Sequence, residues 1–201
     1  EGMRLSDIAL LYRSNAQSRV LEHSLFRAGL SYRVYGGLRF FERQEIKHAL
    51  AYLRLAANPD DDGAFTRVVN FPPRGIGARS LEQLQDAARA GRLSLYAAVG
   101  SVRGAAAAKL SGFVSLVERL RDETRAMPLP LLVEQVIDSS GLVASYQTER
   151  EGQDRIENLR ELVNAASAFL AEEGLGQDVP ANAGVSRAVA PAPAAQVALI
   201  D

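Results

Sequence analysis

The sequence predicts a mainly α-helical fold preceded by a short strand–helix–strand piece. Apolar residues recur at helical spacing from about residue 41 to 172, whereas the first 40 residues hold two short apolar runs around a single helical segment. The stretch "FPPRGIGARS" at 71–80, here called the elbow, breaks the helical pattern with a proline pair and two glycines that flank one apolar residue.

The first 40 residues have the pattern of an α/β sheet. "DIALLYR" (7–13) predicts a buried strand, and "SYRVYGG" (31–37) predicts a second strand that ends at paired glycines. Between them, Ser14 and Gln17 fit a capping box that opens a helix, and Gly29 fits its C-terminal stop. Two strands are too few for a complete sheet.

The remaining elements are predicted as helices. "RQEIKHALAYLRLAANP" carries one apolar stripe and stops before Pro59, and the Asp triplet 60–62 is expected to cap the next helix rather than bind metal. Further helices are expected at about 78–90, 94–99, 104–126, 129–139 and 153–172. Residues 174–201 are rich in Ala, Pro and Gly without periodicity, which predicts a linker.

Composition narrows the function classes. The chain has 201 residues, no cysteine and a net charge of −1, so disulfides and thiol catalysis are excluded and bulk charge gives no reason to expect nucleic acid. The charge is unevenly spread: residues 1–54 hold nine Lys/Arg against five Asp/Glu, and residues 122–173 hold four against eleven. No apolar run is long enough for a membrane span. Because the chain opens with Glu-Gly and enters an apolar run almost at once, we expect a segment of a longer protein.

A search for catalytic motifs is negative. The sequence lacks a G-x-x-x-x-G-K-[ST] phosphate loop and a G-x-S-x-G nucleophile elbow. His23 and His48 have no second ligand at metal-binding spacing, so surface or interface roles are expected for both. We therefore expect no catalytic residue, no metal site and no cofactor in this chain, and no enzymatic activity of the chain alone.

Arg13 and Asn15 form the first candidate binding site. They follow the first predicted strand, where open α/β sheets present ligand-binding groups. Their side chains, with the N-terminus of the next helix, could bind phosphates or bases. Helix capping by Ser14 and Asn15 explains the pattern equally well, and the two interpretations stay open. For the nearby Tyr35, Phe40 and Phe41, core packing is favoured over base stacking.

The elbow is the second candidate site. Its layout, an apolar helix end, a G-h-G turn and a new helix, is that of a helix-hairpin-helix. Gly75 and Gly77 allow close approach of another molecule, and the following helix N-terminus suits a phosphate. Arg74 and Arg79 flank the turn with positive charge. This chemistry permits a grip on a nucleic-acid backbone, but it does not exclude a simple tight turn.

Three blocks of the sequence resemble one known family. "DIALLYRSNAQSRVLEHSL", "YRVYGGLRFFERQEIKHALAYLRLAANPDDDGAF" and "RVVNFPPRGIGARSLE" closely resemble the UvrD/Rep/PcrA-type superfamily 1 DNA helicases. The resemblance is strong over about residues 7–90 and looser to about 170. In that family two RecA-like motor domains bind ATP between them, and each carries an inserted accessory domain.

The resemblance implies a division of the chain into parts. Residues 1–40 would belong to the second motor domain, called 2A; residues 41–173 would form the helical accessory domain, called 2B; and residues 174–201 would lead back to the motor. ATP and Mg²⁺ would then be bound by the parent protein outside this chain. The implied protein is an ATP-dependent 3′–5′ helicase of DNA repair or replication, located in the bacterial cytoplasm at the nucleoid.

The resemblance also implies roles for particular residues. Arg13 and Asn15 match motor positions that contact single-stranded DNA. The segment Arg74, Gly75, Ile76 and Gly77 matches the element by which the accessory domain grips duplex DNA, with Arg79 beside it. Gly36 and Gly37 are candidates for the hinge on which this domain swivels.

Two other functions stay open. The acidic region 122–173, with Glu157 and Glu161, could dock a repair or transcription protein, which would make the chain a protein-interaction module of a helicase. Alternatively, the chain could belong to a recombination helicase–nuclease subunit, which shares the motor but also needs a nuclease domain.

Overall fold

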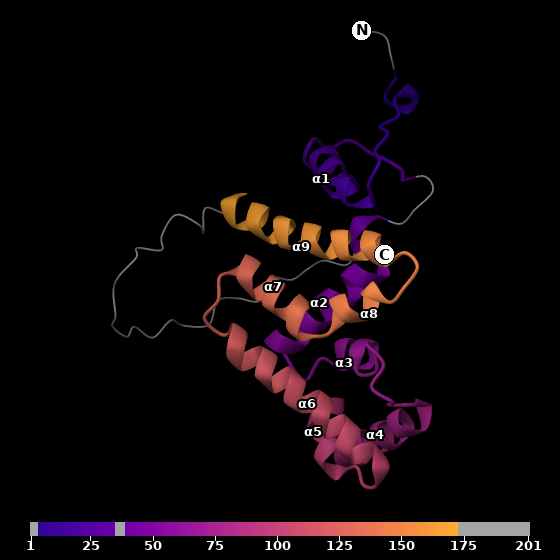
Figure 1. Ribbon diagram of the computed structural model, residues 1–201, viewed down its shortest axis with the longest axis vertical. Helices are drawn as coiled ribbons and strands as arrows, with labels where there is room; N and C mark the ends of the chain where they lie inside the picture. The colour runs from indigo at the N-terminus through magenta and orange to yellow at the C-terminus, as the bar shows by residue number, and fades with distance from the viewer. Residues whose placement is uncertain (1–3, 35–38, 173–201) are drawn as a thin grey trace, which may run out of the picture.

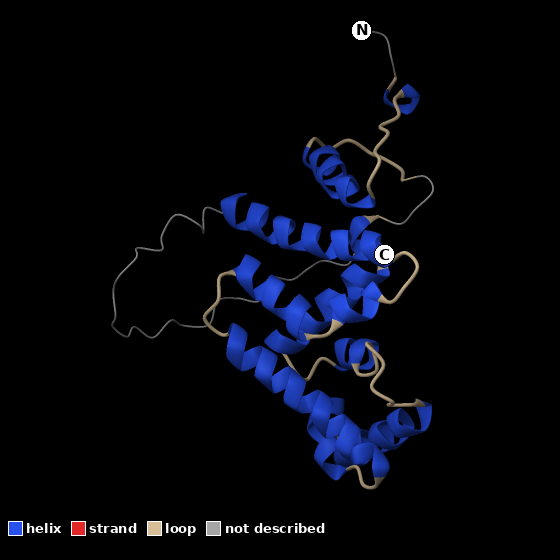
Figure 2. Ribbon diagram, in the orientation of Figure 1, coloured by secondary structure: helices blue, strands red, loops and turns tan. Residues whose placement is uncertain are grey.

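The computed structural model describes residues 4–34 and 39–172, and every regular element in these two stretches is a helix (Figures 1 and 2). The mainly α-helical prediction is therefore confirmed. The elements are η1 (Leu5–Asp7), η2 (Asn15–Gln17), α1 (Ser18–Arg27), η3 (Phe40–Glu42), α2 (Gln44–Ala57), α3 (Asp62–Val68), α4 (Ala78–Gly91), α5 (Leu95–Ala98), η4 (Val99–Ser101), α6 (Ala105–Thr124), α7 (Leu129–Ser139), α8 (Leu142–Gln147) and α9 (Gly152–Glu172).

The helices are arranged along one long axis (Figure 1). Helix α1 lies at one end, next to α9. Helix α9 packs on α7, α8 and α2, and α2 also contacts α3 and α6. Helices α4 and α5 pack together at the opposite end. The long helix α6 connects that end with the middle of the molecule.

The strands expected at 7–13 and 31–37 are not confirmed. Residues 8–12 and 30–34 have no regular structure, and residues 35–37 lie outside the described part of the chain. A strand needs a neighbouring strand for its backbone hydrogen bonds, and residues 4–34 and 39–172 contain none. The apolar run is consequently exposed, with Leu11 95% accessible.

The predicted ends of the first helix are found. The Gln17 side chain reaches back and accepts a hydrogen bond from the Ser14 amide (3.2 Å), which is half of a capping box, although the first turn is the 3-10 helix η2. Gly29 adopts a positive φ of 67° just after α1, and the Leu30 amide donates to the Leu25 carbonyl (2.9 Å). This is the glycine-terminated helix end that the sequence predicts.

Helix α2 is the centre of the core. It contacts α3, α6, α7 and α9, so its buried face is wider than a single amphipathic stripe. Ile46, Tyr52 and Leu55 are fully buried, and His48 is only 5% exposed. The surface or interface role expected for His48 is therefore wrong, because a neighbouring helix covers the face of α2 on which it lies.

The Asp triplet serves as caps and crosslinks. The Asp61 carboxylate accepts from the Ala64 amide (2.8 Å) at the start of α3, and this bond is the main reason that its pKa is lowered. Asp62 accepts from the Leu95 amide (2.7 Å), and Asp60 accepts from the hydroxyl of Ser94, which itself caps α5. The predicted capping role of the triplet is confirmed at Asp61. Among the described residues, no group of three or more His, Cys, Asp or Glu is placed to hold a metal ion.

Helix α8 was not predicted from the sequence. It has six residues, too few to show a helical period, and it begins directly after Gly141, whose φ is 82°. Its Tyr146 side chain is fully buried, so α8 forms one wall of the core between α7 and α9.

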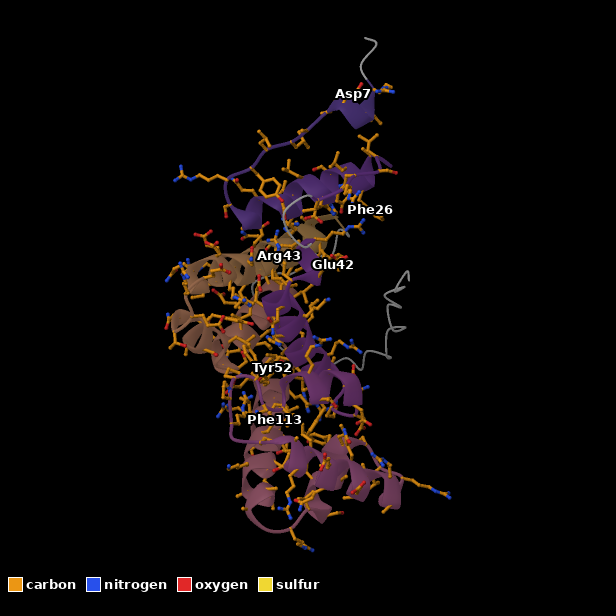
Figure 3. The ribbon with its side chains drawn as sticks, turned by 90° about the vertical axis from the view of Figure 1, so that its right-hand side faces the viewer. Asp7, Phe26, Glu42, Arg43, Tyr52 and Phe113 are labelled. Carbon is orange, nitrogen blue, oxygen red and sulfur yellow. The ribbon has the colours of Figure 1, made fainter. Side chains whose placement is uncertain are left out.

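A buried group of polar side chains joins the N-terminal part to the helical body. The Arg43 guanidinium donates to Asn158 Oδ1 (2.8 Å) and to Ser18 Oγ (2.8 Å), and the Asn158 amide donates to Glu45 Oε1 (2.6 Å). We call Ser18, Arg43, Glu45 and Asn158 the polar joint; all four are buried. Figure 3 shows Arg43 between α1 and the body of the molecule.

Three predictions are not tested by the structure. The hinge residues Gly36 and Gly37 and the linker 174–201 lie outside the described part of the chain. The domain boundary after residue 40 stays a prediction. None of the helices in the described ranges is both long and apolar enough to cross a membrane.

Candidate nucleic-acid interface

The elbow connects α3 to α4 and is shaped by one asparagine. The Asn70 side-chain oxygen accepts from the backbone amides of Arg74 (2.9 Å) and Ile76 (3.0 Å). Ile76 itself is 1% exposed and belongs to the core. One polar crosslink and one apolar anchor therefore fix the loop, and the two glycines face outward on either side of the anchor.

Arg74 points into the protein. Its Nη1 donates to the carbonyl oxygens of Val68 and Pro72 (both 3.1 Å), and its Nη2 donates to the Tyr52 hydroxyl (2.6 Å) and to the Ser140 carbonyl (3.2 Å). The guanidinium carbon lies 5.3 Å from the centre of the Phe113 ring and 5.8 Å from that of Tyr52. Tyr52 and Phe113 lie one above the other in the middle of the molecule (Figure 3).

Tyr52 supports the elbow from α2. Its hydroxyl donates to the Phe71 carbonyl (2.6 Å) and accepts from Arg74. Burial raises the pKa of Tyr52 to about 12, although the Arg74 cation opposes this. The phenol therefore stays protonated and can both donate and accept at neutral pH.

Gly75 occupies a position that only glycine fits well. Its φ is 69°, in the left-handed region. A Cβ there would lie 2.7 Å from Lys109 Nζ, whose ammonium donates to the Gly75 carbonyl (2.8 Å). Lys109 is exposed on α6, so it adds a positive charge to the elbow from 34 residues away in sequence.

Gly77 leaves the N-terminus of α4 open. It is the N-cap residue, has an ordinary φ of −86°, and provides no side chain to accept from the first-turn amides. A Cβ at Gly77 would meet nothing within 4 Å. The first turn of α4 contains no acidic residue but does contain Arg79, which is exposed. A cation at a helix N-terminus interacts unfavourably with the helix dipole, so Arg79 does not stabilise α4 by its charge. The charge is instead placed to attract an anion that binds at this N-terminus.

The rear of the elbow rests on an aromatic group. The Phe71 ring stacks on the His48 imidazole with ring centres 3.9 Å apart, and His48 Nδ1 lies 2.8 Å from the Tyr146 hydroxyl. Burial, followed by the positive charges of Arg67 and Arg155, lowers the pKa of His48 to about 4. His48 is therefore neutral at physiological pH and acts as a structural support.

The other predicted site lies in the N-terminal part of the chain, beside α1 and away from the elbow. Arg13 is exposed, and its backbone amide donates to the Gln17 side chain (3.1 Å). The neighbouring Ser14 hydroxyl donates to Glu157 on α9 (3.0 Å). The side chain of Asn15 lies outside the described part of the structure. Arg13 and the elbow thus form two separate candidate surfaces.

The two acidic residues considered for partner docking make contacts within the chain. Glu161 pairs with Arg19 (2.5 Å), and both side chains are only 13% exposed. Glu157 accepts from Ser14. These carboxylates attach α9 to the N-terminal part, so a charge reversal there would disturb the fold as well as any partner surface.

An open apolar groove lies between α1, η3 and α9. Phe26, Phe41 and Phe169 line it, and each is more than half exposed. The adjacent Phe40 is fully buried. The core-packing expectation therefore holds for Phe40 and is wrong for Phe41; Tyr35 lies outside the described residues.

Sequence reasoning did not find Asn70, Tyr52, Ser140 and Lys109 at the elbow. Asn70 could have been suspected, because asparagine side chains near the start of a turn often accept hydrogen bonds from turn amides, and Asn70 precedes the Pro-Pro-Arg-Gly segment by one residue, Phe71. The other three come from α2, the end of α7 and α6. No local pattern marks them, because only the tertiary packing brings them to the turn.

Comparison with known proteins agrees with the resemblance of the three sequence blocks. A family model described as "UvrD-like helicase C-terminal domain" matches residues 1–178. DNA helicase II of Escherichia coli is 48% identical over 195 residues, which cover 93% of this chain and 27% of the relative. ATP-dependent DNA helicase PcrA of Bacillus subtilis is 42% identical over 173 residues, covering 83% and 23%. The chain spans about a quarter of the length of these relatives.

Proposed function

Because this chain belongs to the family of UvrD-like helicase C-terminal domains, we propose that it is the accessory, duplex-binding segment of an ATP-dependent 3′–5′ DNA helicase of repair or replication. The names of its relatives, DNA helicase II and ATP-dependent DNA helicase PcrA, support the helicase assignment. The parent protein would bind ATP and Mg²⁺ with other segments, since this sequence holds no phosphate loop. The chain itself would not hydrolyse ATP.

One observation carries the proposed DNA contact. The elbow presents glycine backbone next to an uncapped helix N-terminus, with the cations Arg79 and Lys109 beside it. Amide donors and flanking cations suit a phosphate and read no base sequence. Binding should therefore be independent of sequence and should weaken as salt is raised, because bound phosphates release counterions.

In the N-terminal part, Arg13 and Asn15 are proposed to contact the single strand in the 2A part of the parent. Residues 41–173 are proposed to be the 2B domain, with the swivel hinge at Gly36 and Gly37. The cellular site would be the bacterial cytoplasm, at the nucleoid.

Gly77 offers the sharpest test of the elbow. Asp is a favoured N-cap residue and a Cβ at Gly77 would meet nothing within 4 Å, so Gly77→Asp should keep or slightly raise the melting temperature. The same carboxylate would occupy the α4 amides and repel phosphate. We expect Gly77→Asp to weaken binding to a short mixed-sequence duplex about tenfold or more by fluorescence anisotropy.

Gly77→Ala is the matched control. It adds a Cβ while leaving the amides uncapped and the charge unchanged, so it should bind more tightly than Gly77→Asp. If wild type and Gly77→Asp bind the duplex equally, with the same salt dependence, the elbow is not the contact and the proposal is wrong.

A further inference from the structure

We propose that Arg74 is a positioning residue, which holds the elbow in shape from inside the protein while Arg79 and Lys109 supply the charge that meets phosphate. The inference rests on the proposed duplex contact of the elbow. Arg74 and Arg79 flank the same turn, so the sequence alone predicts the same role for both. The inference assigns them different roles.

The hydrogen-bond capacity of Arg74 is nearly used up. A guanidinium has five N–H donors, four of them on its two Nη atoms. Each Nη donates to two protein acceptors, so all four of these N–H groups are engaged. Only Nε–H is left, and a forked contact to a phosphate would require breaking bonds that hold the elbow.

The four acceptors come from different parts of the fold. Val68 is at the end of α3, Pro72 is in the elbow, Tyr52 is on α2, and Ser140 follows α7. Arg74 therefore ties the elbow to two helices that do not neighbour it in sequence. The guanidinium also lies near the rings of Tyr52 and Phe113, and Arg74 as a whole is half-buried, whereas Arg79 and Lys109 are exposed.

The other two cations differ from Arg74 in both respects. Arg79 is exposed in the first turn of α4. Lys109 is exposed, and its bond to the Gly75 carbonyl uses one of the three N–H groups that an ammonium can donate. Each can therefore bind a phosphate without giving up the structure of the elbow.

The first test is the charge-conserving variant Arg74→Lys, compared with Arg79→Lys. Lysine is an adequate point charge for phosphate, but its single nitrogen cannot serve four separate acceptors. We expect Arg74→Lys to lower the melting temperature by roughly 5 °C and duplex affinity by about tenfold, while Arg79→Lys stays near wild type. Near-wild-type melting and binding by Arg74→Lys would overturn the proposal.

Tyr52→Phe provides a second test at a residue that cannot touch DNA, since Tyr52 is fully buried. The substitution removes the hydroxyl that receives Arg74 Nη2 and should weaken duplex binding with an unchanged salt slope. Arg79→Gln should instead reduce the slope of log affinity against log salt by about one phosphate contact. Wild-type affinity in Tyr52→Phe, together with a slope loss in Arg74→Gln, would contradict the positioning role.

A measurement on the wild-type chain covers the case in which these variants fail to fold. In ¹⁵N NMR of the arginine side chains, the bonded Nη groups of Arg74 should rotate and exchange slowly without DNA and shift little when duplex is added, whereas the signals of Arg79 should shift. Fast exchange of Arg74 in the free protein would refute the inference. Absence of any salt-sensitive duplex binding would refute the proposed function instead, and the free-state signals would still decide the role of Arg74.

Discussion

The protonation of His48 should make the stability of the fold depend on pH between about 7 and 4. In the folded chain the pKa of His48 is lowered to about 4, first by burial and then by Arg67 and Arg155, against 6.5 for a free histidine. Below pH 6.5, His48 therefore becomes protonated in the unfolded chain while it stays neutral in the folded chain. Stability that is present above pH 6.5 is lost as the pH falls towards 4.

The size of this loss follows from the two pKa values. The full difference of about 2.5 units corresponds to roughly 3 kcal/mol. Most of it is reached by pH 5, where linkage gives a loss of about 2 kcal/mol relative to pH 7. This is a large share of the 5–15 kcal/mol by which domains are typically stable. Because the His48 ring stacks on Phe71 of the elbow, protonation of His48 would weaken the packing of the elbow against α2.

The contribution of His48 to the pH dependence of stability can be measured by urea unfolding of wild type and His48→Gln at pH 7 and pH 5. Glutamine does not titrate, so the stability gap between the two proteins should narrow by about 2 kcal/mol at pH 5. Carboxylates titrate in both proteins and cancel in the comparison. The other histidine, His23, is exposed on α1, and His23→Gln controls for the loss of one imidazole. A gap that stays constant between pH 7 and pH 5 would refute the assignment.

Three further predictions concern the fold around the two candidate sites. Gly75→Ala should destabilise the chain by about 1–2 kcal/mol, since its φ is positive and Lys109 must move away from the added Cβ, with the strained backbone as the main cost, whereas Gly77→Ala should cost under about 1 kcal/mol by thermal unfolding. A double-mutant cycle on Arg19 and Glu161, both mostly buried, should give a coupling of about 1–2 kcal/mol, and additive single effects would argue against a working ion pair. Asp61→Ala removes the N-cap of α3 and should cost about 1 kcal/mol in urea unfolding, while an unchanged midpoint would show that the cap contributes nothing.

Helical elements could be predicted from the sequence because their signals are local. The helices α2, α4, α6, α7 and α9 begin and end within about two residues of the predicted positions. The apolar spacing of these helices can be recognised within a few residues. The same is true of the caps of α3 and α5, Asp61 and Ser94, and of the end of α1 at Gly29. Helix α8 was missed because six residues cannot show a helical period.

The predicted strands are not confirmed, and the reason is different. "DIALLYR" has the composition of a buried strand, but a strand is stabilised only by a neighbouring strand. The composition of a segment indicates that it can form a strand. A strand forms, however, only where a neighbouring strand is present to pair with it. The described residues offer no such partner, and Leu11 is almost fully exposed. His48 is the reverse case, because burial against α8 depends on a helix that the sequence did not reveal.

The position of the elbow between two helices was predicted, but its internal contacts were not. The glycines and the helix that follows them mark the turn, because both signals are local. The direction of Arg74 could not be predicted, since its partners Tyr52 and Ser140 lie 22 and 66 residues away. The contribution of Lys109 is hidden for the same reason.

The burial pattern of the elbow supports the separate tasks that we propose for its residues. Burial alternates along residues 74–77: Arg74 is half-buried with its guanidinium bonded inside the protein, Ile76 is buried, and Gly75 and Gly77 are exposed. The inward pair anchors the loop by hydrogen bonds and by apolar packing. The outward positions carry no side chain, so the surface that remains is backbone alone. A surface of this kind cannot distinguish bases, and it needs charge from neighbouring helices, which Arg79 and Lys109 can supply. This alternation supports the proposal that the elbow contacts duplex DNA without sequence preference.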